Sequence, residues 1–226
     1  SKRGVGALVR VISAPDPFVG SEQLAETYGL GTLVPNTILL GDTQEESHRT
    51  AYCRMVEKFY FSKKNVLIVR DDETGGFGER KLIDIWWGGL QANGALMLIL
   101  AYLLQSSIQW QDARVRLKMV VPDEEAAREA RVNLAAMAER TRTGAEPHVM
   151  ASEGRPFFDI LHQSSRDADL VFMGIAKPTP GEFEDYYAEL RERTEGLPPT
   201  IFVLAAEEIA FREVLLRYDH AMDHVD

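Results

Sequence analysis

The sequence is poor in cysteine and in basic residues, and both shortages exclude whole classes of protein. Cys53 is the only cysteine among 226 residues, so the chain has no internal disulfide framework and fits a reducing compartment. Lys and Arg together number 25 against 35 Asp and Glu, a formal net charge of −10. Because such an excess of carboxylates repels phosphate, the sequence excludes nucleic acid as an expected partner and disfavours a polybasic membrane-surface patch.

The sequence also lacks a long apolar run. Its longest uncharged stretch lies between Asp84 and Asp112, but the continuous apolar part covers only residues 95–104. A bilayer span needs about 20 apolar residues, so we interpret this stretch as a helix buried inside a soluble protein. The chain opens at Ser1 without an initiator Met or a signal peptide, and we expect it to be cut from a longer protein or to carry a tag remnant.

Short β-branched runs alternate with longer helical patterns along the chain. Strands are predicted at residues 5–12, 36–40, 65–70, 81–87, 114–121, 146–151, 169–174 and 200–205. Helices are predicted between and after them, at residues 21–28, 45–61, 93–106, 123–141, 156–165, 181–194 and 207–218. Ser21 and Asp123 are the expected N-caps. The helix at 93–106 is apolar on every side and is expected to be central.

Strands separated by helices favour parallel pairing with right-handed crossovers. We therefore predict an α/β fold, a layered parallel sheet with helices on both faces. Residues 1–72 are predicted to form a partial unit of order βαβαβ, whose front half is missing or contributed from elsewhere. Residues 80–218 are predicted to form a complete unit of order βαβαβαβαβ with a closing helix, and residues 219–226 a frayed acidic tail.

The motifs of common phosphate and catalytic sites do not occur. The patterns GxxxxGK[ST] and GxSxG are missing, the glycines at 29–31 precede a strand, and the glycine-rich run 75–78 is predicted to be a flexible hairpin turn. Gly41 and Gly174 remain as candidates, because each ends a predicted strand just before a loop and a helix, where an anion can bind. A tight-turn role explains these two glycines equally well.

Metal and nucleophile sites find little support either. His48, His148 and His162 are isolated in the sequence; His220 and His224, beside Asp219 and Asp223, have chelating spacing but lie in the last seven residues. Cys53 lies within a predicted helix, as packed thiols do. We therefore predict no catalytic, cofactor-binding or metal-binding residue and no enzymatic activity. A small-molecule effector is compatible with the sequence, which offers no residue set for one.

Three tryptophans stand out in the apolar part of the sequence. Trp86 and Trp87 end a predicted strand next to two glycines, and Trp110 follows the uncharged helix. Two interpretations are open. The tryptophans pack in the core, or they form an oligomer or interdomain surface, where Trp is enriched as an anchor.

Several segments occur in an order typical of one protein family. They are GLG at 29–31, VPNTILLG at 34–41, NVLIVR at 65–70, IDIWW at 83–87, YLL at 102–104, Trp110, RVR at 114–116, ADLV at 168–171 and LPP at 197–199. Together they resemble the C-terminal cytosolic domain of the cation–chloride cotransporter family, in the amino-acid–polyamine–cation superfamily of secondary transporters. The family's PNTV and IDVWW segments are the most specific of these matches.

The resemblance implies tandem units similar to universal stress proteins. It further implies a non-catalytic regulatory and dimerisation domain on the cytoplasmic side of the cell membrane, homodimeric, with transmembrane spans before Ser1 in the same polypeptide. Residues 88–94 replace the family's acidic FDDGG-like loop, and no phosphoregulatory Ser/Thr stretch is evident, so a prokaryotic-type member is expected. Residues 174–181 lack the second glycine of the ATP loop of stress proteins. The alternative is a free-standing, nucleotide-binding protein similar to universal stress proteins.

Overall fold

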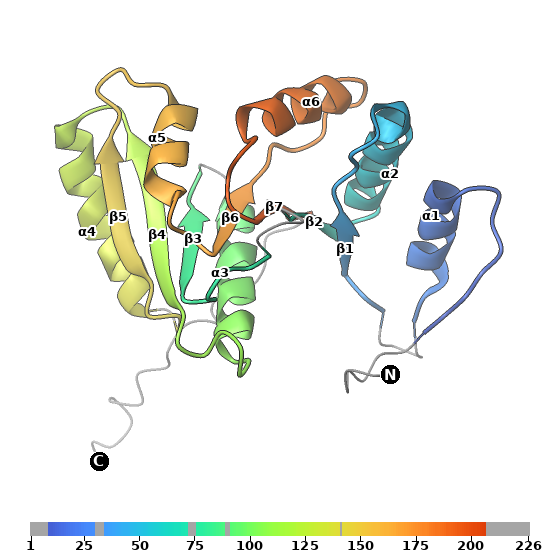
Figure 1. The fold of residues 1–226 in the computed structure, drawn as a ribbon, viewed down its shortest axis with the longest axis horizontal. Helices are drawn as coiled ribbons and strands as arrows, with labels where there is room; N and C mark the ends of the chain where they lie inside the picture. The colour runs from blue at the N-terminus through green and yellow to red at the C-terminus, as the bar shows by residue number, and fades with distance from the viewer. Residues whose placement is uncertain (1–8, 30–33, 72–75, 89–90, 141, 207–226) are drawn as a thin grey trace, which may run out of the picture.

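A seven-stranded sheet runs through the described part of the chain, in the order β1-β2-β7-β6-β3-β4-β5 (Figure 1). The structure is a computed structural model that describes residues 9–29, 34–71, 76–88, 91–140 and 142–206. The strands are β1 (Thr37–Gly41), β2 (Asn65–Arg70), β3 (Leu82–Trp86), β4 (Arg114–Val121), β5 (Glu146–Ala151), β6 (Leu170–Gly174) and β7 (Thr200–Leu204). Short apolar runs bounded by turn residues produce these strands, as the sequence predicts.

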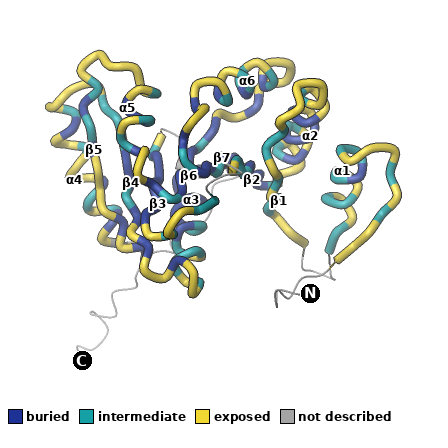
Figure 2. The backbone as a smooth tube through the Cα atoms, in the orientation of Figure 1, coloured by how far each residue is buried: buried dark blue, intermediate teal, exposed yellow. Residues whose placement is uncertain are grey.

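Helices cover both faces of the sheet. They are α1 (Pro17–Thr27), α2 (Arg49–Phe61), α3 (Gln91–Gln105), α4 (Glu124–Arg140), α5 (Phe157–Ser165) and α6 (Phe183–Arg193), with a short 3-10 turn, η1 (Glu46–His48), before α2. One core cluster joins α3 and α4 to the sheet, and a second joins α2, α5 and α6 to the opposite face. Figure 2 shows the buried backbone concentrated in the strands between these two layers.

The α/β fold class is confirmed, with one difference in strand direction. Five neighbouring strand pairs are parallel, but β2 and β7 pair antiparallel, with Ile68 opposite Phe202. No crossover helix connects β2 directly to β7, so the rule that favours parallel pairing does not act on this pair. The antiparallel pair joins β1 and β2 to the five later strands, β3 to β7, in one sheet.

The N-terminal elements differ from prediction in two ways. Residues 9–12 form no strand in the structure, although the sequence predicts one over 5–12; residues 5–8 lie outside the described residues. Asp16, not Ser21, caps α1, because its Oδ1 accepts hydrogen bonds from the N–H groups of Phe18 and Val19 at 2.8 and 2.9 Å. Pro17 then stands at the first helical position, where its missing N–H costs nothing.

Further predictions can be checked within the described residues. Asp123 caps α4 as predicted, accepting from the Ala126 N–H at 2.9 Å. The turn at 75–78 is not a hairpin, because β2 and β3, which it connects, are not neighbours in the sheet. The predicted helix at 207–218 and the tail at 219–226 lie outside the described residues. Among the residues described, no helix combines the length and apolar character that crossing a bilayer requires.

Two of the three tryptophans pack in the core. Trp86 is 3% exposed and meets Phe157 edge to face, and Trp110 is 6% exposed and meets Phe77 in the same way. Trp87 is half-buried and lies against α3, where a Cβ added at Gly94 would clash with its ring. Core packing therefore accounts for Trp86 and Trp110.

Candidate functional site

The two candidate glycines lie in different surroundings. Gly174 ends β6, which lies beside β3. The connections that follow these two strands run toward opposite edges of the sheet, and α/β folds commonly bind ligands at such a switch point. Here the space is filled by Asn93, which is 3% exposed. Its amide donates to the Ile175 carbonyl at 2.9 Å and accepts from the Ala205 N–H at 2.8 Å. A Cβ on Gly174 would lie 3.0 Å from the Asn93 side chain, so no ligand group fits directly against Gly174.

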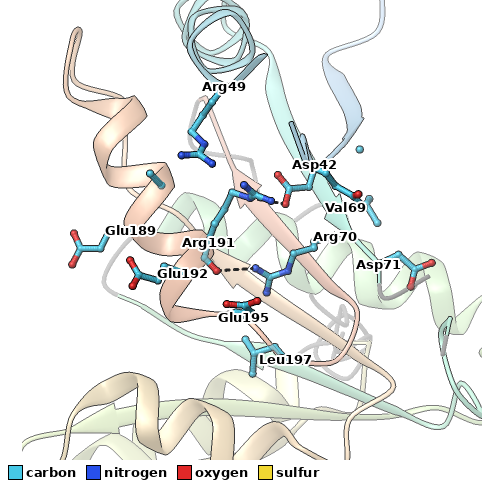
Figure 3. Close-up of a pocket in the computed structure, with 14 residues that line it drawn as sticks. Asp42, Arg49, Val69, Arg70, Asp71, Glu189, Arg191, Glu192, Glu195 and Leu197 are labelled. Atoms are coloured by element: carbon cyan, nitrogen blue, oxygen red, sulfur yellow. Dashed lines mark hydrogen bonds and ion pairs between the residues drawn. The ribbon is translucent and has the colours of Figure 1, made fainter. Parts of the chain in front are cut away.

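Gly41, in contrast, opens into a pocket of about 1090 Å³ (Figure 3). A Cβ built on Gly41 would meet nothing within 4 Å. The pocket lies at the carboxyl ends of β1 and β2, between the start of α2 and the last turns of α6. Its lining residues are mostly charged or small: Gly41, Asp42, Gln44, Arg49, Val69, Arg70, Asp71, Ala188, Glu189, Arg191, Glu192, Glu195, Gly196 and Leu197.

Asp42 anchors one wall of this pocket. Its carboxylate accepts from the Tyr187 hydroxyl at 2.7 Å and from Arg191 Nε at 2.9 Å, and only 5% of its side chain is exposed. The Tyr52 hydroxyl donates to the Gly41 carbonyl at 2.8 Å. Burial, followed by the nearby Asp42 carboxylate, raises the pKa of both phenols, so both hydroxyls stay protonated and donate. The end of β1 is thereby fixed to α6.

The three pocket arginines are engaged to different degrees. Arg70 caps the end of α6, donating to Thr194 Oγ1 at 2.8 Å and to the Thr194 carbonyl at 2.5 Å. Arg191 is paired with Asp42. Arg49 reaches from α2 toward Arg191 (Figure 3), and its buried Nε is the one buried side-chain N or O atom of the described residues without a hydrogen-bond partner. Arg49 Nη1 also lies 3.5 Å from Oε1 of the exposed Glu46, so this long surface pair and the unsatisfied Nε make Arg49 the least engaged of the three arginines.

The pocket's residues suit binding better than nucleophilic catalysis. Its described lining holds three guanidinium groups and five carboxylates, but no Ser, Cys, His or Lys. The acidic rim disfavours a bare anion, except beside Arg49. The arrangement therefore favours a ligand that presents an anionic group to Arg49 and polar or cationic groups to the rim.

A second polar cluster lies inside the sheet, where β3 and β4 pass under α5. Asp84 is fully buried, and its carboxylate accepts from Arg116 Nε at 2.6 Å and Arg116 Nη2 at 2.9 Å. Lys118 Nζ lies 2.7 Å from the same carboxylate, and the Ser165 hydroxyl donates to it at 2.6 Å. Asp167 pairs with Arg116 from the solvent side. The two negative charges of the cluster balance its two positive charges. Its hydrogen bonds tie the end of α5 to the sheet.

Lys118 is the most deeply buried base of this cluster, at 1% exposure. Burial lowers the pKa of Lys118, while its hydrogen bond and attraction to Asp84 act in the opposite direction. Its ammonium also donates to Ser164 Oγ at 2.8 Å and lies 5.6 Å from the centre of the Trp86 ring. Every hydrogen-bonding direction of the ammonium meets a partner, so we assign this cluster to stability and not to chemistry.

The sequence-predicted site residues are scattered. His48 lies 3.2 Å from Glu45, His148 lies 3.8 Å from Glu146, and His162 contacts the Arg193 carbonyl at 2.9 Å, each on its own part of the surface. Nowhere in the described ranges do three or more His, Cys, Asp or Glu side chains gather in a way that could hold a metal. The pair at 220 and 224 lies outside those ranges.

Cys53 offers a direct test of the packed-thiol interpretation. The thiol is 2% exposed within α2, and burial is the main cause that raises its pKa to about 12. Because only the thiolate reacts, we expect native Cys53 to react with iodoacetamide at pH 8 about 100-fold or more slowly than the urea-unfolded chain. Following alkylation by mass spectrometry measures both rates. Equal rates in the two states would show an open thiol.

The sequence analysis does not identify the charged residues that define the pocket and the buried cluster around Asp84. A signal existed for the buried one: Asp84 is the only acid inside an apolar strand, and Arg116 and Lys118 alternate at the spacing of one strand face. No comparable signal marks Arg49 or Asp42, which stand among many charged residues at helix starts. The sequence predicts Asn93 only as the first residue of a helix.

Comparison with known proteins gives matches in structure alone. No protein-family model matches the chain, and no curated protein matches it in sequence. The crystal structure of the cytoplasmic domain of a prokaryotic cation chloride cotransporter is similar, with 21% identity and a TM-score of 0.61, over 86% of this chain and 71% of that one. A universal stress protein from Archaeoglobus fulgidus DSM 4304 is also similar, with 16% identity and a TM-score of 0.55, over 86% of this chain and 67% of that one. At these identities the likeness establishes the fold that the three proteins share.

Proposed function

We propose that this chain is a cytosolic regulatory and dimerisation domain of a membrane transporter similar to the cation–chloride cotransporters. One observation carries the proposal: the segments that resemble this family lie, in chain order, on strands of a fold that the cotransporter's cytoplasmic domain shares. The PNTILLG segment enters and forms β1, IDIWW forms most of β3, and ADLV leads into β6. The proposal is therefore supported both by the order of these segments and by the shared fold.

In this role the domain binds a second copy and couples its own conformation to that of the transporter, and it carries out no catalysis. Two copies would pair beneath the transport spans of the same polypeptide, at the cytoplasmic side of the membrane. Regulation would require contacts that differ between two conformations of the transporter. The pocket beside Arg49 lies between α2 and α6, so a ligand there would contact both helices and could change how they pack.

Fractionation of native cells tests the transporter assignment. An antibody raised against this chain should detect a membrane-bound band much larger than 25.4 kDa, because the spans would belong to the same polypeptide. Extraction with detergent, but not with high salt, should release the band. A band in the soluble fraction at the chain's own mass, obtained without detergent, would contradict the assignment.

A free-standing nucleotide-binding protein is the second candidate, favoured by the pocket at Gly41 and by Arg49, which is only weakly engaged by Glu46. It predicts that calorimetry detects Mg-ATP binding and that Arg49→Met weakens it by about tenfold or more, since a charge-assisted hydrogen bond is lost. Arg54→Met, on the exposed side of the same helix, is the matched control and should bind as the parent does. Absence of heat for the parent chain would count against this candidate.

A further inference from the structure

The pocket at Gly41 lies across the antiparallel junction of the sheet. Arg70, at the end of β2, is the partner of Thr200, at the start of β7. One side of the pocket comes from the ends of β1 and β2 and the start of α2, and the other comes from the last turns of α6 and the turn before β7. A ligand held there therefore contacts two parts of the chain that are far apart in sequence.

Some charges of the pocket are already engaged within the protein. Arg191 pairs with Asp42, and Glu189 pairs with Arg193 one turn further along α6. Arg70 donates its hydrogen bonds to the end of α6. These contacts hold the walls of the pocket together, so the charges that select a ligand are chiefly the others of the lining.

The remaining charges differ in sign between the two sides of the pocket. Glu192 and Glu195, at the end of α6, take part in no ion pair among the residues that the structure describes. Arg49, from α2, has only its long contact with Glu46 at 3.5 Å and a buried Nε without a partner. Figure 3 shows Arg49 on one side of Arg191, and the two glutamates on the other. The pocket thus offers one positive group and, at a distance from it, a pair of negative groups.

This arrangement disfavours two simple kinds of ligand. The lining holds two more carboxylates than guanidinium groups, so a ligand with several negative charges and no counter-charge is repelled. A plain cation would leave Arg49 in its weak contact with Glu46, whereas a ligand carboxylate can pair with the guanidinium directly. The ligand that suits both sides therefore carries one carboxylate and, several bonds away, a cationic group.

Apolar side chains of the same lining favour an apolar linker between these two groups. Val69, Ala188 and Leu197 all belong to the lining. Leu197 is only 8% exposed, and the other two are half-buried. Methylene groups can pack on these side chains, as the stems of Lys and Arg pack on apolar surface elsewhere in proteins. A chain of methylene groups therefore suits the pocket better than a sugar ring or a peptide backbone.

We propose that this pocket binds a free basic amino acid of the lysine type, with its carboxylate on Arg49 and its side-chain ammonium on Glu192 and Glu195. At neutral pH such a ligand carries one negative and two positive charges, so its net charge is opposite to that of the lining. The ligand contacts α2 and α6 together and couples the two parts of the chain across the β2–β7 junction. The inference concerns the pocket alone and holds with or without membrane spans in the polypeptide.

Titration of the 226-residue chain with L-lysine, followed by NMR of the backbone amides, tests this proposal. We expect saturable shifts at Gly41 and Gly196, on the two sides of the pocket, with a dissociation constant on the order of 1 mM for so small a ligand. L-Norleucine lacks the side-chain ammonium and cadaverine lacks the carboxylate. Each should bind at least about tenfold more weakly than lysine, because one charged contact is lost.

Variants of the pocket assign the two charged contacts. Arg49→Met should weaken lysine binding by about tenfold and leave cadaverine binding little changed, because cadaverine has no carboxylate. The double variant Glu192→Gln, Glu195→Gln should weaken lysine binding similarly and leave norleucine binding little changed. Arg54→Met, exposed on α2, and Glu129→Gln, exposed on α4, are the matched controls and should bind lysine as the parent does.

The ligand series on the parent chain decides the proposal even where a variant fails to fold. Tighter binding of lysine than of both analogues supports it. Cadaverine binding as tightly as lysine would mean that the acidic rim attracts any cation, and norleucine binding as tightly would mean that only the carboxylate is recognised; either result would overturn it, as would the absence of saturable shifts. Shifts at Gly41 with Mg-ATP but not with lysine would overturn it in favour of the nucleotide candidate. Cell fractionation bears on the transporter assignment alone, so the two proposals fail separately.

Discussion

Replacing Asp84 with Asn should lower the free energy of unfolding by about 3–5 kcal/mol, the cost of leaving buried charges without their partner. The amide keeps the size of the carboxylate, so packing is little changed. It removes the negative charge that Arg116 Nε and Lys118 Nζ contact at 2.6 and 2.7 Å. Urea unfolding followed by circular dichroism gives the free energy, and an unchanged slope shows that the unfolded state is unaltered.

Asp167→Asn is the matched control for this prediction. Asp167 contacts the same Arg116 at 2.9 Å, but 58% of its side chain is exposed, so solvent already screens the pair. We expect a loss of about 1 kcal/mol or less. The double variant Asp84→Asn, Lys118→Met should recover part of the Asp84→Asn loss, because the methionine removes the unpaired ammonium. Equal losses for Asp84→Asn and Asp167→Asn would contradict a buried, unscreened cluster.

The seven strands of the sheet were predictable from the sequence, although the strand predicted at 5–12 does not form over residues 9–12. Their pairing was only partly predictable. β2, β4 and β5 begin and end at the predicted residues, because apolar runs bounded by turn residues mark buried strands locally. The crossover rule predicts the parallel pairs β1–β2, β3–β4, β4–β5 and β6–β7, which a helix connects. It has no bearing on β2 and β7, whose pairing joins residues about 130 positions apart and depends on which strand edges remain free.

The candidate site shows the same limit at the level of single residues. Gly41 and Gly174 follow the same local pattern, and both end a strand before a loop and a helix. What separates them is Asn93, which is 82 positions from its partner Ile175 and fills the space at Gly174 alone. The sequence therefore predicts both glycines as candidate ligand-binding positions, but it does not show which of the two borders an open pocket.

Asn93→Ala should lower the free energy of unfolding by about 2–4 kcal/mol, a loss somewhat smaller than that expected for Asp84→Asn. The amide serves two buried backbone groups, the Ile175 carbonyl and the Ala205 N–H, and alanine leaves both without a partner. Helix propensity opposes the loss slightly, because alanine favours the α3 helix. Urea unfolding measures the loss, and amide hydrogen exchange should show faster exchange at Ala205.

Asn133→Ala provides the control, because Asn133 lies exposed on α4 and should change stability by about 0.5 kcal/mol or less, in the stabilising direction. A small loss for Asn93→Ala with unchanged exchange at Ala205 would mean that water replaces the amide and that the space beside Gly174 admits small polar groups. A large loss with fast exchange would mean that Asn93 closes this end of the sheet as part of the fold. In that case a packed core occupies the end of β6, whereas Gly41 lines an open pocket.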